Sequence, residues 1–174
     1  MKVFLTGNQQ FGRKGAIRAY KRPFESVDEM NQHLIDKWNS VVSDGDVIFV
    51  LGNFVWDPQT ARNVLKELKG NIHIMQGEWD LAAYDISTEG NSQIDFIEEG
   101  IHVIPDTSLC LSYWPLSEWP GKKNEWTSII GYPNKKYKTS HNKNILNASC
   151  DFWDYKPIEA KNILGLFEDL KSTD

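Results

Sequence analysis

Polar side chains follow three short apolar runs of the sequence, where an enzyme built on a β-sheet commonly carries its reacting groups. Three of these side chains are neutral amides, one is a carboxylate and one is an indole: Asn8 and Gln10 after residues 3–5, Asn53 after residues 46–52, Glu78 and Trp79 after residues 71–77. An amide has no proton to exchange near neutral pH, so it is neither a general base nor a nucleophile. These segments therefore lie where a catalytic site is expected, but their amides cannot act as a general base or a nucleophile.

Two later strand ends are aromatic, and a basic segment follows the first apolar run of the chain, residues 3–5. Tyr113 and Trp114 follow one apolar run, and Tyr132 and Asn134 follow the next. Together with Trp79 these rings either form a stacking surface for a planar ligand or fill space in a closed cleft. The basic segment either receives a phosphate or an acidic partner or is a solvated face; its cations are Arg13, Lys14, Arg18 and Arg22.

Composition limits the class of protein. The chain has 174 residues, 40% of them hydrophobic and 25% charged, which predicts one globular domain over residues 1–174. A net charge of −5 argues against a nucleic-acid-binding protein, which normally carries a basic surface. Cys110 and Cys150 lie in apolar runs and indicate reduced core residues. Because no apolar run is long enough for a signal peptide or a membrane span, we expect a cytoplasmic protein without membrane contact.

Hydrophobic patterning predicts the elements that position these residues. Strands are expected at 1–6, 46–52, 71–77, 101–104, 108–114, 126–132 and 145–153, and helices at 27–41, from 58 to a stop at Gly70, at 81–84, at 92–99 and at 158–171. Ser26 and Glu29 have the spacing of a capping box. Strand and helix alternate in the first half and strands dominate the second, so we expect a layered α/β sandwich of mixed sheets flanked by helices.

The order of these segments resembles the calcineurin-like metallophosphoesterase family, especially its small phage and bacterial members. The matching residues recur in order over nearly the whole chain: Phe11-Gly12, Arg22-Pro23-Phe24, Trp38-Asn39, Leu51-Gly52, Gly77, Asp80, Leu111-Ser112, Pro115-Leu116, Gly131 and Trp153-Asp154-Tyr155-Lys156-Pro157. The resemblance implies a layered metallophosphoesterase-like sandwich whose strand ends face a two-metal site.

The positions of that metal site are changed throughout. Where the family has metal-binding Asp and His residues and a catalytic His, this chain has Asn8, Gln10, Arg13, Asn53, Glu78, Trp79, Tyr113, Tyr132 and Asn134. Amide oxygens are weak neutral ligands, and an indole has no lone pair to donate to a metal. Without metals, nothing lowers the pKa of a bound water to near neutrality. We therefore expect a pseudoenzyme with no cofactor and no metal.

Three functions remain open on this interpretation. The first is a non-catalytic protein, most simply of phage type, that binds or inhibits a host macromolecule through its loops; a protein partner is expected. The second is a protein that retains a nucleotide or phosphate ligand by aromatic stacking and Arg13 without hydrolysing it. The third is a residual phosphodiesterase with rebuilt metal ligands, although the four histidines do not cluster in the predicted elements.

Overall fold

The computed structural model describes residues 1–90, 93–134, 139–140, 144–163 and 165. Its first sheet has the order β10-β1-β2-β3-β4. Four strands run parallel: β1 (Val3–Thr6), β2 (Val47–Leu51), β3 (Asn71–Met75) and β4 (Ile94–Ile97). β10 (Ile158–Glu159) closes the edge antiparallel to β1, with Leu5 opposite Ile158. The parallel strands therefore all end at the same edge of the sheet.

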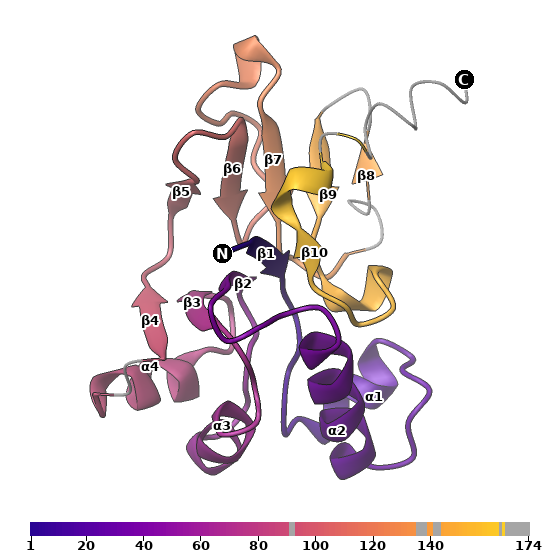
Figure 1. Cartoon of the computed structure of the whole chain (residues 1–174). Coiled ribbons are helices and arrows are strands. Elements are labelled where there is room, and N and C mark those ends of the chain that lie inside the picture. Colours follow the sequence, from indigo (N-terminus) through magenta and orange to yellow (C-terminus); the bar gives the residue numbers. More distant parts are fainter. Residues whose placement is uncertain (91–92, 135–138, 141–143, 164, 166–174) are drawn as a thin grey trace.

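Four helices cover one face of this sheet: α1 (Lys14–Ala19), α2 (Val27–Asn39), α3 (Pro58–Leu65) and α4 (Leu81–Thr88). Successive strand residues point to opposite faces, so β2 sends Ile48 and Val50 to the helices and Leu51 to the other side. The helices pack Met30, Leu34 and other buried apolar residues against these strand residues. Figure 1 shows this helical layer below the sheet.

A second sheet packs on the opposite face of the first. Its order is β5-β6-β7-β9-β8, from β5 (Ile101–Val103), β6 (Leu109–Ser112), β7 (Thr127–Ile130), β8 (Thr139–Ser140) and β9 (Ile145–Asn147). The three central strands are parallel and both edge strands antiparallel. Leu111 and Ile129 meet Leu5 and Leu51 in the core between the sheets. The result is the expected α/β sandwich of two mixed sheets flanked by helices (Figure 1).

Most predicted elements are confirmed, and four are corrected. The strand expected at 145–153 ends at Asn147, and Cys150–Phe152 form a 3-10 turn because the chain bends there to place Asp151 against Arg22. Residues 92–99 were expected to be helical, but 94–97 form β4, because pairing with β3 outweighs the polar composition of the segment. The helix expected at 158–171 does not begin at Ile158, which lies in β10; the residues at 164 and 166–174 lie outside the described part. α3 ends at Leu65 rather than near Gly70.

Three local signals for helix starts can be compared with the structure: the start of α3, the Ser26 cap of α2, and the return contact of Glu29. The first two form as the sequence predicts. Asp57 caps α3 by accepting the backbone N–H of Thr60 at 2.9 Å, and Pro58 lies in the first turn. Ser26 caps α2 by accepting the N–H of Glu29 at 3.1 Å. The Glu29 carboxylate bonds the N–H of Glu25 instead of that of Ser26, so the box is reciprocal only in part. No helix in the described ranges has the length and apolar character to cross a membrane.

Candidate functional site

The polar strand ends meet where the parallel strands of the first sheet finish. The segment after β1 is bonded to the segment after β2, with the Asn8 N–H 2.9 Å from the Gly52 carbonyl and the Gln10 N–H 2.8 Å from the Asn53 carbonyl. Asn8, Gln10 and Asn53 all have left-handed backbones, with φ values of 60°, 54° and 55°. Such non-glycine residues are strained, and strain of this kind gathers at functional sites.

These three side chains form a buried group, which we call the amide cluster (Asn8, Gln10 and Asn53). Each is at most 2% exposed. The Gln10 amide donates to the Asn8 carbonyl oxygen and to the Tyr20 hydroxyl, the latter at 2.9 Å. The Asn8 amide donates to Asp151 at 2.8 Å. The cluster's side-chain groups find their partners inside the protein, as buried amides must.

Tyr113 closes the cluster from the second sheet. Its side chain is 2% exposed, and its hydroxyl accepts the Asn53 amide at 2.9 Å. Burial raises the pKa of the Tyr113 phenol well above its ordinary value, against the opposing effect of the Asn53 hydrogen bond, so the ring is neutral at physiological pH. Gly52 makes room for this ring, since a Cβ there would lie 2.4 Å from Tyr113 Cδ2. Tyr113 therefore fills the cleft rather than lining it.

Arg22 does not lie on the rim, contrary to the sequence prediction. Its side chain is fully buried and bonds Asp151 at 2.8 and 3.0 Å, the Asn8 carbonyl at 2.6 Å and the Gln9 carbonyl at 2.7 Å. Burial alone would lower the pKa of Arg22, but Cys150 and Asp151 raise it above its ordinary value, so the guanidinium stays charged. Arg22 thus holds the segment after β1 through the carbonyl groups of Asn8 and Gln9.

The rim instead carries an arginine packed on two adjoining tryptophans, whose ring centres lie 5.8 Å apart, and we call this group the Arg13 clamp (Arg13, Trp56 and Trp79). The Arg13 guanidinium carbon lies 4.9 Å from the Trp56 ring centre and 5.0 Å from that of Trp79. Its Nη1 donates to the Gln10 side-chain oxygen, which ties the clamp to the amide cluster. Trp56 is 47% and Trp79 40% exposed. Sequence reasoning did not single out Trp56, because no local pattern links it to Arg13.

The remaining predicted residues lie around this centre. Trp114 is exposed, stacks near Tyr132 with ring centres 5.0 Å apart, and donates to Glu99 at 2.8 Å. Glu78 and Asn134 are exposed. Lys14 and Arg18 lie exposed on α1. The structure therefore brings the aromatic residues together as one buried plug, Tyr113, and an exposed rim. The sequence also predicts a second basic loop from Lys135, Lys136, Lys138, His141 and Lys143, and these residues lie outside the described part of the chain.

The described side chains do not offer a metal centre. No group of three or more His, Cys, Asp or Glu residues in the described ranges is arranged to hold a metal ion. The nearest buried carboxylate, Asp80, accepts the backbone N–H groups of Asn53, Phe54 and Gly77 at 2.6–2.8 Å. Burial raises the pKa of Asp80 above its ordinary value, although these hydrogen bonds act to lower it. Its oxygens therefore accept hydrogen bonds from the backbone that follows β2 and β3.

A polar pocket lies beside the amide cluster. Its volume is about 680 Å³, and the residues that line it include Tyr20, Lys21, Asn134, Ser149 and Asp151. Tyr20 and Asp151 are also hydrogen-bond partners of the cluster. A volume of this order suits a small organic ligand, so the pocket is the place where such a ligand would approach the amide cluster.

Comparison with known proteins identifies a shared fold but gives no activity. No known family's sequence profile matches the chain. An uncharacterized protein of Methanocaldococcus jannaschii is 29% identical over 174 residues, covering 96% of this chain and 92% of that protein. The crystal structure of a protein of unknown function from Aquifex aeolicus superposes with a TM-score of 0.71 at 18% identity, covering 95% of this chain and 98% of that one. The likeness to this structure shows a shared fold.

Proposed function

We propose that this protein is a non-catalytic, metallophosphoesterase-like protein that acts by binding another protein at the rim around the amide cluster. One observation carries the proposal: the buried amides bond one another and Tyr113, while Trp56 and Trp79 are exposed beside them and the half-buried Arg13 packs on both rings. Exposed tryptophan and arginine are the residues that most often dominate the energy of protein interfaces.

Catalysis is disfavoured by what the buried groups already do. Phosphodiester hydrolysis needs an activated water and a group that protonates the leaving oxygen. Asn8, Gln10 and Asn53 ionise at no physiological pH, and Tyr113 is held neutral by its raised pKa. Trp79, where the resembled family has its catalytic imidazole, packs on Arg13.

The second candidate, retention of a nucleotide or phosphate ligand, rests on the polar pocket. Lys21 supplies a cation for a phosphate, and Tyr20 and Phe152 supply rings at the wall. Arg13 itself is engaged by two indoles, so in this candidate the ligand binds at the pocket and the clamp contributes little. Raised melting temperature with a nucleotide would identify it.

Two measurements test the proposal. Elemental analysis of the purified protein, followed by an assay of bis(p-nitrophenyl) phosphate with added Mn²⁺, should give no stoichiometric metal and no turnover above buffer. Stoichiometric metal with turnover that Glu78→Gln abolishes would establish the residual phosphodiesterase instead. A pull-down with the wild-type chain as bait should capture a specific protein that the double variant Trp56→Ala/Trp79→Ala loses, and Lys66→Gln retains.

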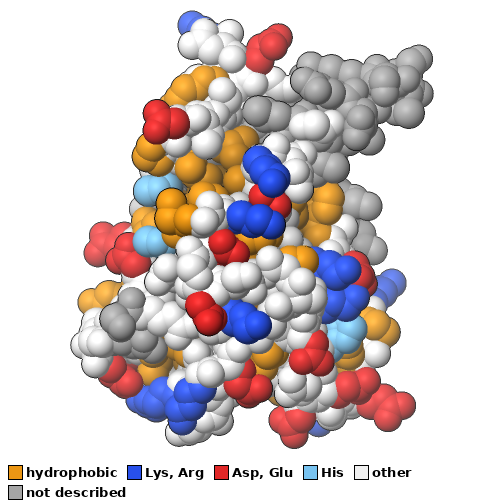
Figure 2. Space-filling model, in the orientation of Figure 1, with side chains coloured by type: hydrophobic (Ala, Val, Ile, Leu, Met, Phe, Trp, Pro, Cys, Tyr) orange, Lys and Arg blue, Asp and Glu red, His pale blue; other side chains and the backbone are white. Residues whose placement is uncertain are grey.

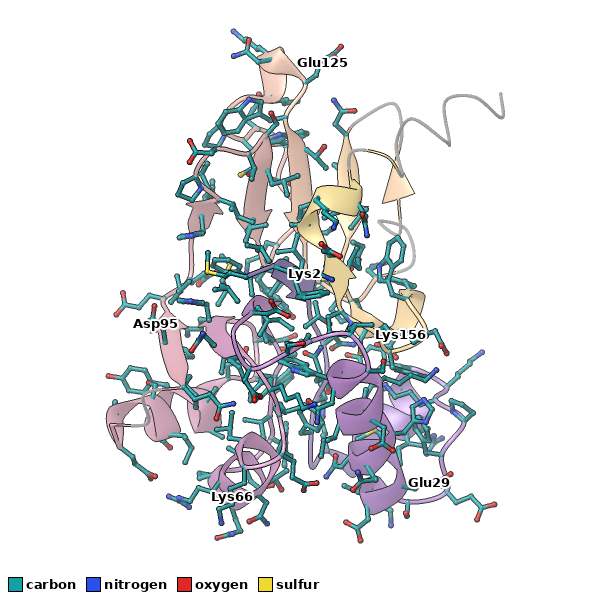
Figure 3. The ribbon with its side chains drawn as sticks, in the orientation of Figure 1. Lys2, Glu29, Lys66, Asp95, Glu125 and Lys156 are labelled. Atoms are coloured by element: carbon teal, nitrogen blue, oxygen red, sulfur yellow. The ribbon has the colours of Figure 1, made fainter. Side chains whose placement is uncertain are left out.

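Lys66 is a suitable control because it lies at the outer end of α3, well away from α1, as Figure 3 shows. Failure of micromolar bait to recover any specific protein would contradict binding as the function. The sequence-based expectations of a phage-type protein, a host target and a cytoplasmic location stay predictions, which the identity of the captured partner would decide.

A further inference from the structure

The Arg13 clamp has unused hydrogen-bonding capacity. A guanidinium has five N–H donors, and in the described residues Arg13 uses its side chain only for the bond from Nη1 to Gln10. No acidic side chain in the described ranges lies within salt-bridge distance of Arg13. A charged fork held at the surface without a carboxylate is a ready site for one.

Three exposed cations accompany Arg13, and two acids adjoin its indole partners, since Asp57 follows Trp56 and the exposed Glu78 precedes Trp79. Lys14, Arg18 and Lys21 are exposed, and none of them pairs with an acid in the part of the chain that the structure describes. Helix α1 carries no acidic residue. The chain as a whole has a net charge of −5, and on the face in Figure 2 basic and acidic side chains alternate. Local positive charge on an acidic protein favours a negatively charged partner by charge complementarity.

Apolar groups adjoin the cation. Arg13 packs on the adjoining rings of Trp56 and Trp79, and α4 extends the surface from Trp79 with Leu81, 77% exposed, and Tyr84, 49% exposed. Leu81 and Tyr84 line one small groove of about 240 Å³ with Phe96, and its other walls are Gln76, Asp80 and Glu98. An apolar side chain of a partner can pack against Trp79 and Leu81 while Arg13 binds a carboxylate, which is the composition of an interface centre.

The amide cluster fixes Arg13 in place before any partner arrives. Gln10 accepts from Arg13 and is itself held by Asn8 and Tyr20 in a buried position. The two indoles restrict the guanidinium plane. Binding therefore loses little side-chain entropy, which is how a preorganised group gains affinity.

From these contacts we infer that the Arg13 clamp, with Lys14 and Arg18, binds an acidic segment of a partner protein that places an Asp or Glu on Arg13 and an apolar side chain against Trp79 and Leu81. The inference rests on the proposed binding function and names the chemistry of its partner. A single-stranded nucleic acid is less suited, because the indole faces directed at Arg13 are covered and cannot stack on bases.

The test uses fluorescein-labelled twelve-residue peptides that combine Glu with Leu or Phe at spacings of one to four residues, read by fluorescence anisotropy. The matched set replaces every Glu by Gln. We expect at least one acidic peptide to bind about tenfold or more tightly than its Gln counterpart, and Arg13→Gln to weaken it about tenfold or more. Lys66→Gln should leave binding unchanged, and Arg18→Gln should mainly reduce the association rate.

Four results would overturn the inference. Gln peptides that bind as tightly as Glu peptides would remove the role of charge, and binding that Arg13→Gln leaves intact would place the site elsewhere. Tighter binding of a labelled dT12 oligonucleotide, lost in Arg13→Gln, would assign the clamp to nucleic acid. A partner captured in the pull-down that no acidic peptide displaces would refute the acidic segment while leaving the proposed binding function standing. Far-ultraviolet circular dichroism of each variant confirms that it is folded.

Discussion

The Arg22 guanidinium and the Asp151 carboxylate form a two-point ion pair, at 2.8 and 3.0 Å, between residues 129 positions apart in the sequence. The Arg22 side chain is fully buried and that of Asp151 is 13% exposed. Asp151 also accepts from Asn8. One carboxylate therefore links the segment after β9 to both the arginine and the amide cluster.

Asp151→Asn should lower the free energy of unfolding by about 3–5 kcal/mol, because it leaves a buried guanidinium without its counter-charge. Urea denaturation followed by tryptophan fluorescence measures the loss. Arg62→Gln, which breaks the exposed Arg62–Glu89 pair, is the control and should change little. A similar small loss in both variants would show that the buried pair is not a structural anchor.

Asn8→Asp should destabilise the protein near neutral pH. The new carboxylate would face Asp151, whose oxygen now accepts the Asn8 amide at 2.8 Å. Burial and the like charge would raise the pKa of the introduced acid, at a cost of about 2–4 kcal/mol at pH 7. Since the raised pKa favours the protonated folded state, the loss should shrink as pH falls toward 4 and grow as it rises.

The same measurement on Asn124→Asp provides the comparison, because Asn124 is exposed. That variant should keep wild-type stability at both pH values. If Asn8→Asp is equally harmless at pH 7, then the cluster tolerates a negative charge, and the expectation that it repels one is wrong.

Asp46 gives the wild-type chain an acid-sensitive contact. Its carboxylate accepts the backbone N–H of Lys2 at 2.8 Å and that of Ser43 at 3.0 Å, which lowers the pKa of Asp46 below its ordinary value. A depressed pKa means stability that is present above the unfolded-state pKa of about 4 and lost as pH falls through the folded-state pKa. Asp46→Asn should therefore lower the melting temperature at pH 7, with the difference shrinking as the pH is lowered below the unfolded-state pKa. A difference that persists there would point to packing rather than charge.

Gly131→Ala should destabilise strongly, because a Cβ at this position would lie 1.6 Å from the Leu51 carbonyl oxygen. The two sheets can separate only by losing core contacts, so we expect a loss of at least about 3 kcal/mol. Gly45→Ala is the matched control, since a Cβ there meets nothing within 4 Å. Thermal unfolding of both variants decides whether close approach of the sheets at Gly131 is required.

Local patterns in the sequence were enough to predict the strands that carry the site. The run ending at Gly52 is apolar throughout because β2 is buried on both faces, and that pattern needs no knowledge of its neighbours. β4 was predicted wrongly as helix because Ile94 and Phe96 stand among polar residues, and only pairing with β3 makes the segment extended.

The site was harder to predict where its contacts are distant in sequence. Arg22 resembles any surface arginine until Asp151 is placed against it. Trp56 gains a role only when folding brings Arg13 beside it. That Tyr113 fills the cleft while Trp79 stays exposed also depends on packing, since sequence allowed stacking surface and plug alike for both rings.

The pairing of β1 with β10 has a consequence for how the protein is made. β1 leaves the ribosome before the other strands of its sheet, yet its outer neighbour, opposite Leu5, is Ile158. The same long loop must close before Gly7 can bridge Ser149 and Asn8 can bond Asp151. Contacts of such sequence separation form late and slow folding. During synthesis β1 therefore remains an open edge, and the amide cluster that holds Arg13 is completed only after nearly all of the described chain has emerged.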